Sequence, residues 1–449
     1  MTPSDYASLL LQSLGSSAVV ETQDNRSAAM LWRASGAMWL TGFSNESPRD
    51  CLAPVASAMQ GAWLALCALC PDSLDPCFDA HGLLGERAAL TKLQRGGTIS
   101  AGGAAHLLQT AHGWMALNLA RDDDWSLMPA WLEAEVTSLA QIRAAVGLKT
   151  AAQLVDRGRL MGLAVAAMPD RQAKTPFDNW LKRQRLAPRV ETLGRRPLVL
   201  DLSSLWAGPL CAQMLQECGA RVIRVESSKR PDGARFGSPT FYDLLNGGKE
   251  SVALQFDTSE GQACLKELLA VADMVIEGSR PRALENLGID AASLVAQGQS
   301  KVWVSITGYG RSAGNRDWIA FGDDAAVAAG LANATGSPPV FCADAVADPL
   351  TGLHAAVAAL QSWQGGGGVL LDVSLFSVAQ SIASLSQTPA ANPPNTTARV
   401  SAAAADALGV ERPRARTAVA KAAQLGAHTK AVLAEVRRLK HGGSKAIAL

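Results

Sequence analysis

The stretch PLVLDLSSLWAGPLCAQMLQECGARVIRVES (197–227) decides the fold class of this chain. Its opening run, PLVLDLSS, is short and apolar, as expected of a buried strand. A helical pattern, AGPLCAQMLQECG, follows and ends on Gly219, and ARVIRVE is a second strand-like run. A strand, a helix and another strand in this order predict two parallel strands joined by a covering helix.

The same alternation continues for most of the second half of the chain. The runs KESVALQF (249–256), ADMVIEG (272–278) and KVWVSITGYG (301–310) are separated by helical patterns, and GGGGVLLDVSLFSVA (365–379) adds a further strand-to-helix unit. The glycines of this unit precede a strand, so they indicate a connecting turn rather than a phosphate cradle. We therefore predict an α/β fold with a doubly wound, Rossmann-like parallel sheet over 196–386, and ligand binding beyond the carboxyl ends of its strands.

The regions outside this large domain have different textures. Residues 27–70 are apolar and helix-rich, and 106–168 combine a hairpin pattern, helical patterns and a short strand, which indicates a smaller α/β domain. The basic stretch 170–195 has scattered prolines. The expected order is an N-terminal segment (1–90), a small domain (91–170), a linker (171–195), the large domain (196–386), a second linker (387–410) and a basic helical tail (411–449).

One internal repeat is visible. VASAMQGAWLALCAL (55–69) parallels VADPLTGLHAAVAAL (346–360), with Gly61 facing Gly352. In this register Ser57 stands where the second copy has Asp348. The segment 1–90 is thus interpreted as a degenerate repeat of the second half of the large domain, and its copy has lost the carboxylate.

Length and charge restrict the class of protein. At 449 residues the chain is too long for one core, and 41 Lys and Arg against 40 Asp and Glu give a net charge of +1. This balance argues against a nucleic-acid or membrane-surface partner. No run of about 18 apolar residues occurs, and MTPSDYASLL lacks a basic segment followed by an apolar core, so a cytoplasmic protein is expected. Cys67 and Cys70 lie in the apolar run AWLALCALC, which favours buried thiols, and no metal site is predicted.

Asp348 attracts attention because it stands directly before Pro349 and an Ala-rich helical run. Asp followed by Pro is typical of a helix start, where the side chain accepts free backbone N–H groups. A carboxylate at a helix N-terminus is also expected to have a lowered pKa and to stay an ionised nucleophile. A nicotinamide dehydrogenase, with Glu226 as ribose ligand, is disfavoured because the first strand's turn (SLWAGPLCAQM) lacks G-x-G-x-x-G. No nucleophile elbow, P-loop or HExxH motif occurs.

An ordered series of segments resembles the class III CoA-transferases, a family that includes formyl-CoA and carnitine CoA-transferases and the related alpha-methylacyl-CoA racemases. The resemblance covers 196–386 almost continuously, and AAQLGAHTKAVLAEV (422–436) is similar to the usual C-terminal signature. It is carried by LDLSSLWAGPLCAQMLQECGARVIRVES (200–227), NGGKESVALQFD (246–257), ADMVIEGSRPRALENLGI (272–289), VSITGYG (304–310), ADPLTGLHAAVAAL (347–360) and LLDVSLFSVA (370–379).

The resemblance implies an acyl-CoA:carboxylate CoA-transferase in which Asp348 attacks the donor thioester. A mixed anhydride forms, CoA thiolate returns to give an aspartyl-CoA thioester, and the acceptor acid takes the CoA. It further implies acyl-CoA and a carboxylic acid as substrates, no permanently bound cofactor, and an interlocked homodimer. The implied CoA site comprises Leu205, Trp206, Ala207, Ser227, Leu254, Gly278 and Ser279, with Arg280 and Arg282 as further phosphate partners.

The chain also departs from the family pattern. Ser227 stands where some members have Arg, so Lys229, Arg230 or Arg235 could serve the phosphates instead. The small domain lies upstream of the large domain, whereas family members place it downstream. Two alternatives stay open: a racemase or isomerase using Asp348 and Asp323, although Phe321-Gly322 stands where the racemases use His, and a non-catalytic CoA-binding subunit.

Overall fold

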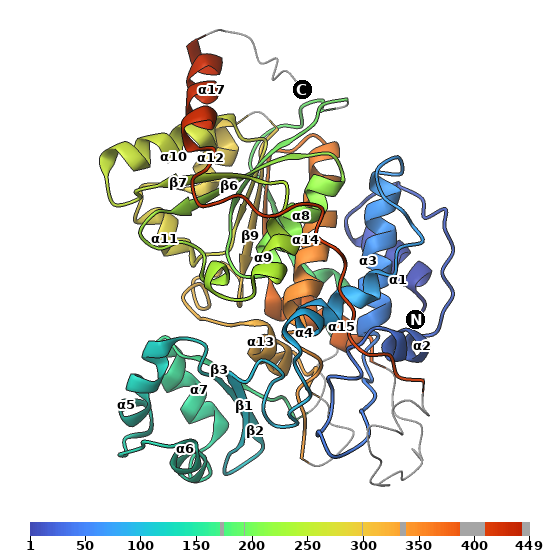
Figure 1. Ribbon diagram of the computed structural model, residues 1–449, viewed down its shortest axis with the longest axis vertical. Helices are drawn as coiled ribbons and strands as arrows, with labels where there is room; N and C mark the ends of the chain where they lie inside the picture. The colour runs from blue at the N-terminus through green and yellow to red at the C-terminus, as the bar shows by residue number, and fades with distance from the viewer. Residues whose placement is uncertain (171–174, 193, 299, 333–337, 387–408, 442–449) are drawn as a thin grey trace.

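The computed structural model describes residues 1–170, 175–192, 194–298, 300–332, 338–386 and 409–441. Two sheets organise this part of the chain, one of seven strands and one of three. Figure 1 shows the N-terminal helices beside the helical layer of the large sheet, and the small sheet at the opposite end of the molecule from α17. The linker predicted over 387–410 lies outside the described residues, except for 409–410.

The large sheet has the strand order β4-β10-β9-β8-β5-β6-β7. Neighbouring strands from β5 to β10 pair in parallel. Counted from β5, these six follow the spatial order 3-2-1-4-5-6, which is a Rossmann order. The order reverses between β5 and β8, so a ligand is expected beyond the carboxyl ends of these strands. The strands are β4 (Leu181–Arg185), β5 (Leu198–Leu202), β6 (Arg221–Ser227), β7 (Glu250–Leu254), β8 (Met274–Glu277), β9 (Val302–Thr307) and β10 (Val369–Ser374).

The range 171–195, predicted as a linker, supplies the edge strand β4, and this part of the prediction is wrong. β4 pairs antiparallel with β10, Leu181 opposite Val373 and Arg185 opposite Val369. Residues 182–185 are exposed, so LKRQR has none of the apolar alternation that marks a half-buried strand. Backbone hydrogen bonds rather than side-chain burial hold this strand, and the sheet is mixed rather than wholly parallel.

Helices cover both faces of the large sheet (Figure 1). Neighbouring residues of one strand enter different cores, because Val302 and Val304 face one layer and Trp303 the other. The first layer contains α8 (Ala207–Glu217), α14 (Ala347–Gln364) and α15 (Leu375–Ser384), and the second α10 (Ser259–Val271), α12 (Ala291–Gln297) and α17 (Thr429–His441). Shorter helices are η3 (Phe177–Trp180), η4 (Gly233–Phe236), α9 (Pro239–Asn246), α11 (Pro281–Glu285) and α13 (Gly322–Ala328).

The N-terminal segment (1–90) forms an added helical layer over α14. α3 lies against α14, and α1 lies on α3. A Cβ at Gly61 would lie 2.6 Å from the carbonyl oxygen of Pro3 in α1, and one at Gly352 would lie 2.6 Å from that of Ala207 in α8. The two repeat helices therefore admit a neighbouring helix at the same position. The elements are α1 (Pro3–Ser13), α2 (Ala28–Ala34), α3 (Val55–Leu69), η1 (Ala80–Gly85) and α4 (Glu86–Thr91).

Buried polar contacts also join the two halves of the chain. The hydroxyl of Tyr6 lies 2.7 Å from Nε2 of His354 on α14. Burial lowers the pKa of His354 to about 4, so this imidazole is neutral near pH 7. The side-chain amide of Gln364 donates to the carbonyl oxygen of Leu69 over 2.7 Å.

The small domain contains the antiparallel sheet β1-β2-β3 and its own core. Its strands are β1 (Ala105–Gln109), β2 (Trp114–Asn118) and β3 (Ala164–Ala167), and its helices η2 (Asp122–Leu127), α5 (Met128–Leu132), α6 (Leu139–Val146) and α7 (Ala151–Leu160). Leu108 and Leu117 face these helices, whereas Leu107 and Ala116 pack on Val327 of α13. The Asn118 amide donates to Asp324 over 2.9 Å, so the small domain rests on α13, whose Asp323 accepts from the Ala345 N–H just before α14.

The C-terminal tail crosses both halves of the chain. The N–H of Glu411 donates to the carbonyl oxygen of Arg33 over 2.9 Å. Further on, α17 packs on α10, and Glu435 accepts two hydrogen bonds from Arg221 of β6 at 2.6 and 2.8 Å. The tail helix thus closes one face of the large sheet.

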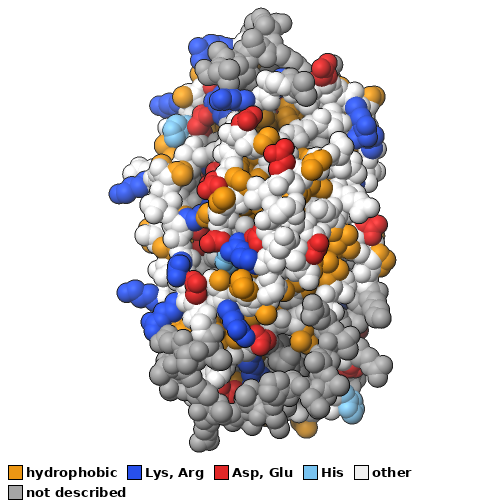
Figure 2. Space-filling view, turned by 90° about the vertical axis from the view of Figure 1, so that its right-hand side faces the viewer, with side chains coloured by type: hydrophobic (Ala, Val, Ile, Leu, Met, Phe, Trp, Pro, Cys, Tyr) orange, Lys and Arg blue, Asp and Glu red, His pale blue; other side chains and the backbone are white. Residues whose placement is uncertain are grey.

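The surface carries charges of both signs, in keeping with the balanced charge of the sequence. Figure 2 shows the face formed by the N-terminal helices, with hydrophobic side chains scattered among charges of both signs. Within the described ranges, no helix combines the length and the apolar character needed to cross a bilayer.

Burial raises the pKa of the Cys67 thiol to about 12, and Cys70 lies 2.8 Å (Sγ–Sγ) from Cys218. The described side chains include no group of three or more His, Cys, Asp or Glu that could hold a metal ion.

Because the first hydrophobic core contains residues of both 1–90 and the large domain, we predict that 191–449 expressed alone will be insoluble or inactive. Without α1, α3 and β4, the apolar faces of α14 and the β10 edge would be left open. Solubility and CoA exchange of the fragment are to be measured with and without 1–190 supplied in trans, which should restore activity. A soluble and fully active 191–449 monomer would show that the N-terminal segment is an appendage.

Candidate functional site

A cavity of about 350 Å³ opens at the carboxyl ends of β5, β8 and β9. Its lining comes from the loops that follow these three strands, from residues 316–321 and from Asp348. It lies where the strand order reverses, as the sheet topology predicts. Its lining comprises Ser204, Leu205, Ala207, Gly208, Gly278, Ser279, Arg280, Ala283, Ile306, Thr307, Gly308, Arg316, Trp318, Ile319, Ala320, Phe321, Asp348 and Leu375.

Asp348 faces this cavity from the first turn of α14. Between Ala347 and Leu360 it is the one residue that is not fully buried. The helix begins at Ala347 with Val346 at the N-cap position, which makes no side-chain capping bond, so the interpretation of Asp348 as a helix cap is wrong. The carboxylate instead accepts a hydrogen bond from the backbone N–H of Gly322. A Cβ at Gly322 would overlap Asp348 Oδ2, so glycine permits this close approach.

The pKa of Asp348 is raised to about 7, against the expectation that a helix N-terminus would lower it. Burial raises it most, and the carboxylates of Asp323 and Asp344 raise it further, whereas Arg87 and the Gly322 N–H lower it. Burial also raises the pKa of Asp323 to about 6. The N-terminal dipole of a helix, worth at most about 2 kcal/mol, does not offset desolvation beside two other carboxylates.

Leu205, which lines the cavity, has a left-handed backbone with φ 68°. Such a conformation costs a non-glycine residue roughly 1–3 kcal/mol and persists where surrounding contacts impose it. Here both carboxylate oxygens of Asp232 accept from the Leu205 N–H, at 3.1 and 3.2 Å. Arg224 of β6 holds Asp232 at 2.5 Å and Asp201 of β5 at 3.0 Å. The strained loop is thus tied to two strands of the sheet.

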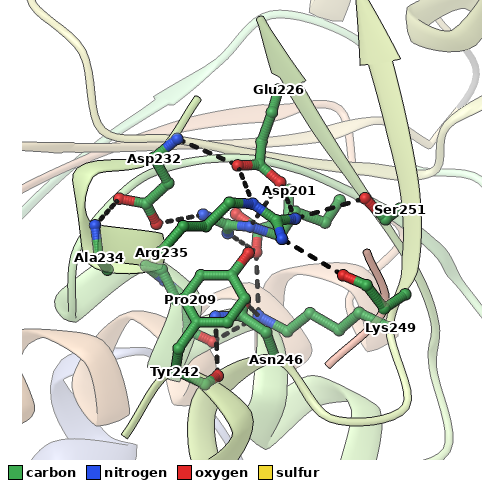
Figure 3. A network of polar contacts seen from close by, with 12 residues as sticks. Asp201, Pro209, Glu226, Asp232, Ala234, Arg235, Tyr242, Asn246, Lys249 and Ser251 are labelled. Atoms are coloured by element: carbon green, nitrogen blue, oxygen red, sulfur yellow. Dashed lines mark hydrogen bonds and ion pairs between the residues drawn. The ribbon is translucent and has the colours of Figure 1, made fainter. Parts of the chain in front are cut away.

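The polar network behind this loop is almost fully removed from solvent. Figure 3 shows Arg235 and Lys249 among the carboxylates of Asp201, Glu226 and Asp232. Burial opposes ionisation of Asp201, but Lys249 and Arg224 outweigh it and lower the pKa of Asp201 to about 2. Burial lowers the pKa of Lys249 to about 8 despite Asp201. Loss of one partner would leave an unpaired buried charge, so the network fixes the geometry of the β5–α8 turn.

The structure brings together about half of the residues predicted for the CoA site. Leu205, Ala207, Gly278, Ser279 and Arg280 line the cavity with Asp348. They come from the turns after β5 and β8, which are distant in sequence and adjacent in the sheet. Their assignment to CoA stays a prediction.

The other predicted positions do not line this cavity. Trp206 is buried, with its ring centroid 5.0 Å from that of Phe241, and Leu254 is buried in the core of the opposite sheet face. The Ser227 hydroxyl accepts from the Arg230 N–H over 3.2 Å. Arg282 is paired with Asp317 at 3.5 Å on the surface.

Two of the three proposed substitutes for Ser227 are also engaged. Lys229 pairs with Asp257 at 2.5 Å, and Arg235 pairs with Glu226 inside the buried network. These positions were implied by the family resemblance, and a matched position in the sequence does not report which way its side chain points.

Sequence reasoning missed two features beside the site. Arg87 of α4 forms a two-pronged ion pair with Asp344, four residues before Asp348. Arg159 of the small domain stacks on Trp318, its Cζ 3.7 Å from the ring centroid, and Trp318 lines the cavity. Neither contact has a local sequence signal, because each joins segments more than 150 residues apart in the chain.

Comparison with known proteins identifies the family of this region. The model of CoA-transferase family III matches residues 197–410. The succinyl-CoA–D-citramalate CoA-transferase of Chloroflexus aurantiacus is 32% identical over 199 residues, which are 40% of this chain and 50% of that protein. The succinate–glutarate CoA-transferase of Agrobacterium fabrum is 30% identical over 204 residues, 41% of this chain and 51% of that protein. Residues 197–410, a little under half of this chain, therefore match CoA-transferase family III.

The chain spans about half the length of these curated relatives. Among solved structures, a CAIB/BAIF family protein from Brucella suis is 30% identical, covering 41% of this chain and 53% of that chain with a TM-score of 0.38. The family match runs from 197 to 410, so residues 1–196 and 411–449 lie outside it.

We predict that Asp348→Asn will stabilise the protein, and more so at pH 8 than at pH 5. The folded-state pKa of about 7 exceeds the ordinary value of 3.8, so the folded state binds more protons in this window. The stabilisation that protonated Asp348 contributes in the wild type is complete below about pH 4 and is lost as pH rises through 7. The free energy of unfolding, obtained from thermal unfolding across pH, should be higher in the variant than in the wild type by about 1 kcal/mol or more at pH 8.

Asp290→Asn is the matched control. This carboxylate accepts from the Ala292 N–H over 3.1 Å at the start of α12, and its bonds to Ser293 and Ala292 hold its pKa below the ordinary value. Its substitution should therefore destabilise slightly at high pH. An Asp348→Asn variant that is less stable than the wild type at pH 8 would contradict the raised pKa of Asp348.

Proposed function

We propose that this protein transfers CoA from an acyl-CoA to a carboxylic acid, with Asp348 as the nucleophile. The single observation that carries the proposal is the exposure of Asp348, alone among the first residues of a buried helix, to the cavity beyond β5 and β8. The match of residues 197–410 to the model of CoA-transferase family III supports the reaction class. Acyl-CoA and the acid are the proposed substrates, and no permanently bound cofactor is part of the scheme.

The chemistry proceeds by two exchanges at one carboxylate. Ionised Asp348 attacks the thioester carbonyl, and CoA leaves as a thiolate while a mixed anhydride forms. The thiolate then attacks the aspartyl carbonyl, the donor acid leaves, and an aspartyl-CoA thioester remains. The acceptor carboxylate repeats these steps in reverse order and departs as the new acyl-CoA, which regenerates Asp348. Each step is balanced without an external oxidant or reductant.

The partly apolar cavity suits such intermediates. Ile306, Trp318 and Phe321 line it beside Asp348, and exclusion of water protects an anhydride from hydrolysis. Asp323, the base of the racemase alternative, is 7% exposed, accepts from the Ala345 N–H over 2.9 Å and is not among the cavity-lining residues. These contacts favour transfer over proton abstraction.

We further propose that the protein acts in the cytoplasm as a homodimer. Sedimentation of the purified chain would test the dimer.

We predict that Asp348→Ala will abolish CoA exchange while the fold and CoA binding persist. The purified protein is to be incubated with a panel of acyl-CoAs and carboxylic acids and scored for exchange, and hydroxylamine should trap an Asp348 hydroxamate when acyl-CoA is present. Exchange at a near wild-type rate in the variant would exclude the covalent mechanism. A wild-type chain that binds CoA without exchanging it would favour the non-catalytic CoA-binding alternative.

A second measurement separates transfer from racemisation. A racemase removes the proton on the carbon next to the thioester, and it therefore incorporates deuterium from deuterated water without any acceptor acid. We expect no incorporation, because no imidazole or free carboxylate other than Asp348 lines the described cavity. Rapid incorporation that is lost in Asp323→Asn would reverse the assignment.

A further inference from the structure

Two neighbouring residues of α4 fasten the N-terminal segment to the rest of the molecule. Glu86 is buried and accepts from Nε and Nη2 of Arg416 at 2.7 and 3.0 Å. Arg416 also donates to the side chain of Gln213 on α8 over 3.2 Å. The start of α4 is thereby fixed between the C-terminal tail and the large domain.

Arg87, the next residue, points to the loop that leads into α14. Its Nε and Nη2 atoms donate to the two oxygens of Asp344 at 2.8 and 2.5 Å. Asp344 is completely buried, and its pair with Arg87 is the two-pronged geometry that fixes both partners. The Arg87 guanidinium also lies over Trp206, its Cζ 5.1 Å from the ring centroid. Arg87 therefore connects the loop before Asp348 with the β5–α8 turn.

The charges around Asp348 come from three elements. Asp323 lies in the first turn of α13, Asp344 lies in the loop before α14, and Arg87 lies on α4. The backbone N–H of Gly322 adds a dipole. The two carboxylates disfavour ionisation of Asp348, whereas Arg87 favours it. Burial opposes the charge of Arg87, but Asp344 outweighs burial and raises the pKa of Arg87, so the guanidinium stays charged.

We propose that Arg87 is a positioning residue of the Asp348 site, which holds the Asp344 loop in place and supplies the cation that favours the ionised nucleophile. The inference rests on the proposed function, because it names the charge that the attacking carboxylate depends on. It also gives residues 1–90, which lie outside the matched family range, a part in the site. The fragment that begins at 191 would lack this cation as well as the helical layer.

The first test is the pH profile of CoA exchange. The rising limb reports ionisation of the nucleophile, and an opposite charge at close range lowers the pKa of a carboxyl by about 1 unit or more. Arg87→Met should therefore move the limb to higher pH by about 1 unit or more, and Arg87→Lys should return it toward the wild-type position. A purely structural role would lower the rate at every pH and leave the limb in place.

Arg26→Met is the matched control. Arg26 lies in the same segment and pairs with Asp24 and Asp79 at 2.7 and 2.9 Å, outside the cavity lining. Its substitution should leave the pH profile unchanged. An unshifted limb in Arg87→Met would overturn the inference, even if its rate is reduced.

The second test does not depend on activity. A double-mutant cycle of Arg87→Met and Asp348→Asn at pH 8, followed by urea unfolding, measures their coupling directly. The midpoint should fall more when Asp348 is present than when Asn occupies the position. If Arg87→Met does not accumulate as folded protein, Arg87→Gln, which can still bond Asp344 without a charge, takes its place.

The two tests separate the two proposals. Coupling in the cycle without any CoA exchange by the wild type would remove the proposed function and keep the charge relation between Arg87 and Asp348. Wild-type exchange with additive midpoints and an unshifted limb would remove the inference alone.

Discussion

The burial of α14 on every side is the constraint on which the rest of the structure depends. This helix lies against the large sheet, α8, α15 and α3, and Asp348 is the only residue of its first three turns that is not fully buried. A helix that is apolar all round cannot be left at a surface. The N-terminal segment supplies the missing cover, and the C-terminal tail fastens that cover through Arg416 and Glu86.

The buried helix also determines the chemistry available to Asp348. Partial burial of its carboxylate and the nearby carboxylates of Asp323 and Asp344 disfavour its ionised form. Arg87 and the N–H of Gly322 act in the opposite direction. A carboxylate with a pKa of about 7 is partly ionised and partly protonated at neutral pH. Such a perturbed pKa is typical of functional sites, and it reduces stability when the group is ionised. Functional sites are also where expectations from local sequence patterns are expected to fail.

Only one half of the chain matches the family model, but the two halves share one hydrophobic core. Residues 197–410 match CoA-transferase family III, and the segment upstream does not belong to that match. The large core nevertheless includes Tyr6, Met59 and Trp63 together with Leu350 and Val357. Gly61 and Gly352 admit α1 and α8 in the same manner, so the repeat seen in the sequence corresponds to two helices with similar surroundings.

The sequence by itself determined the parallel strands from β5 to β10, the helices between them and the place of Asp348 at the start of α14, because short apolar runs and helical periods are local patterns. The family resemblance further pointed to Leu205, Ala207, Gly278, Ser279 and Arg280, which line one cavity in the structure, while their role in binding CoA stays a prediction. Only the tertiary structure decided that β4 completes the sheet, that Asp348 is not a helix cap, and that Arg87 reaches Asp344. Edge pairing, desolvation and ion pairs between distant segments depend on which parts of the chain become neighbours, and no local pattern records that.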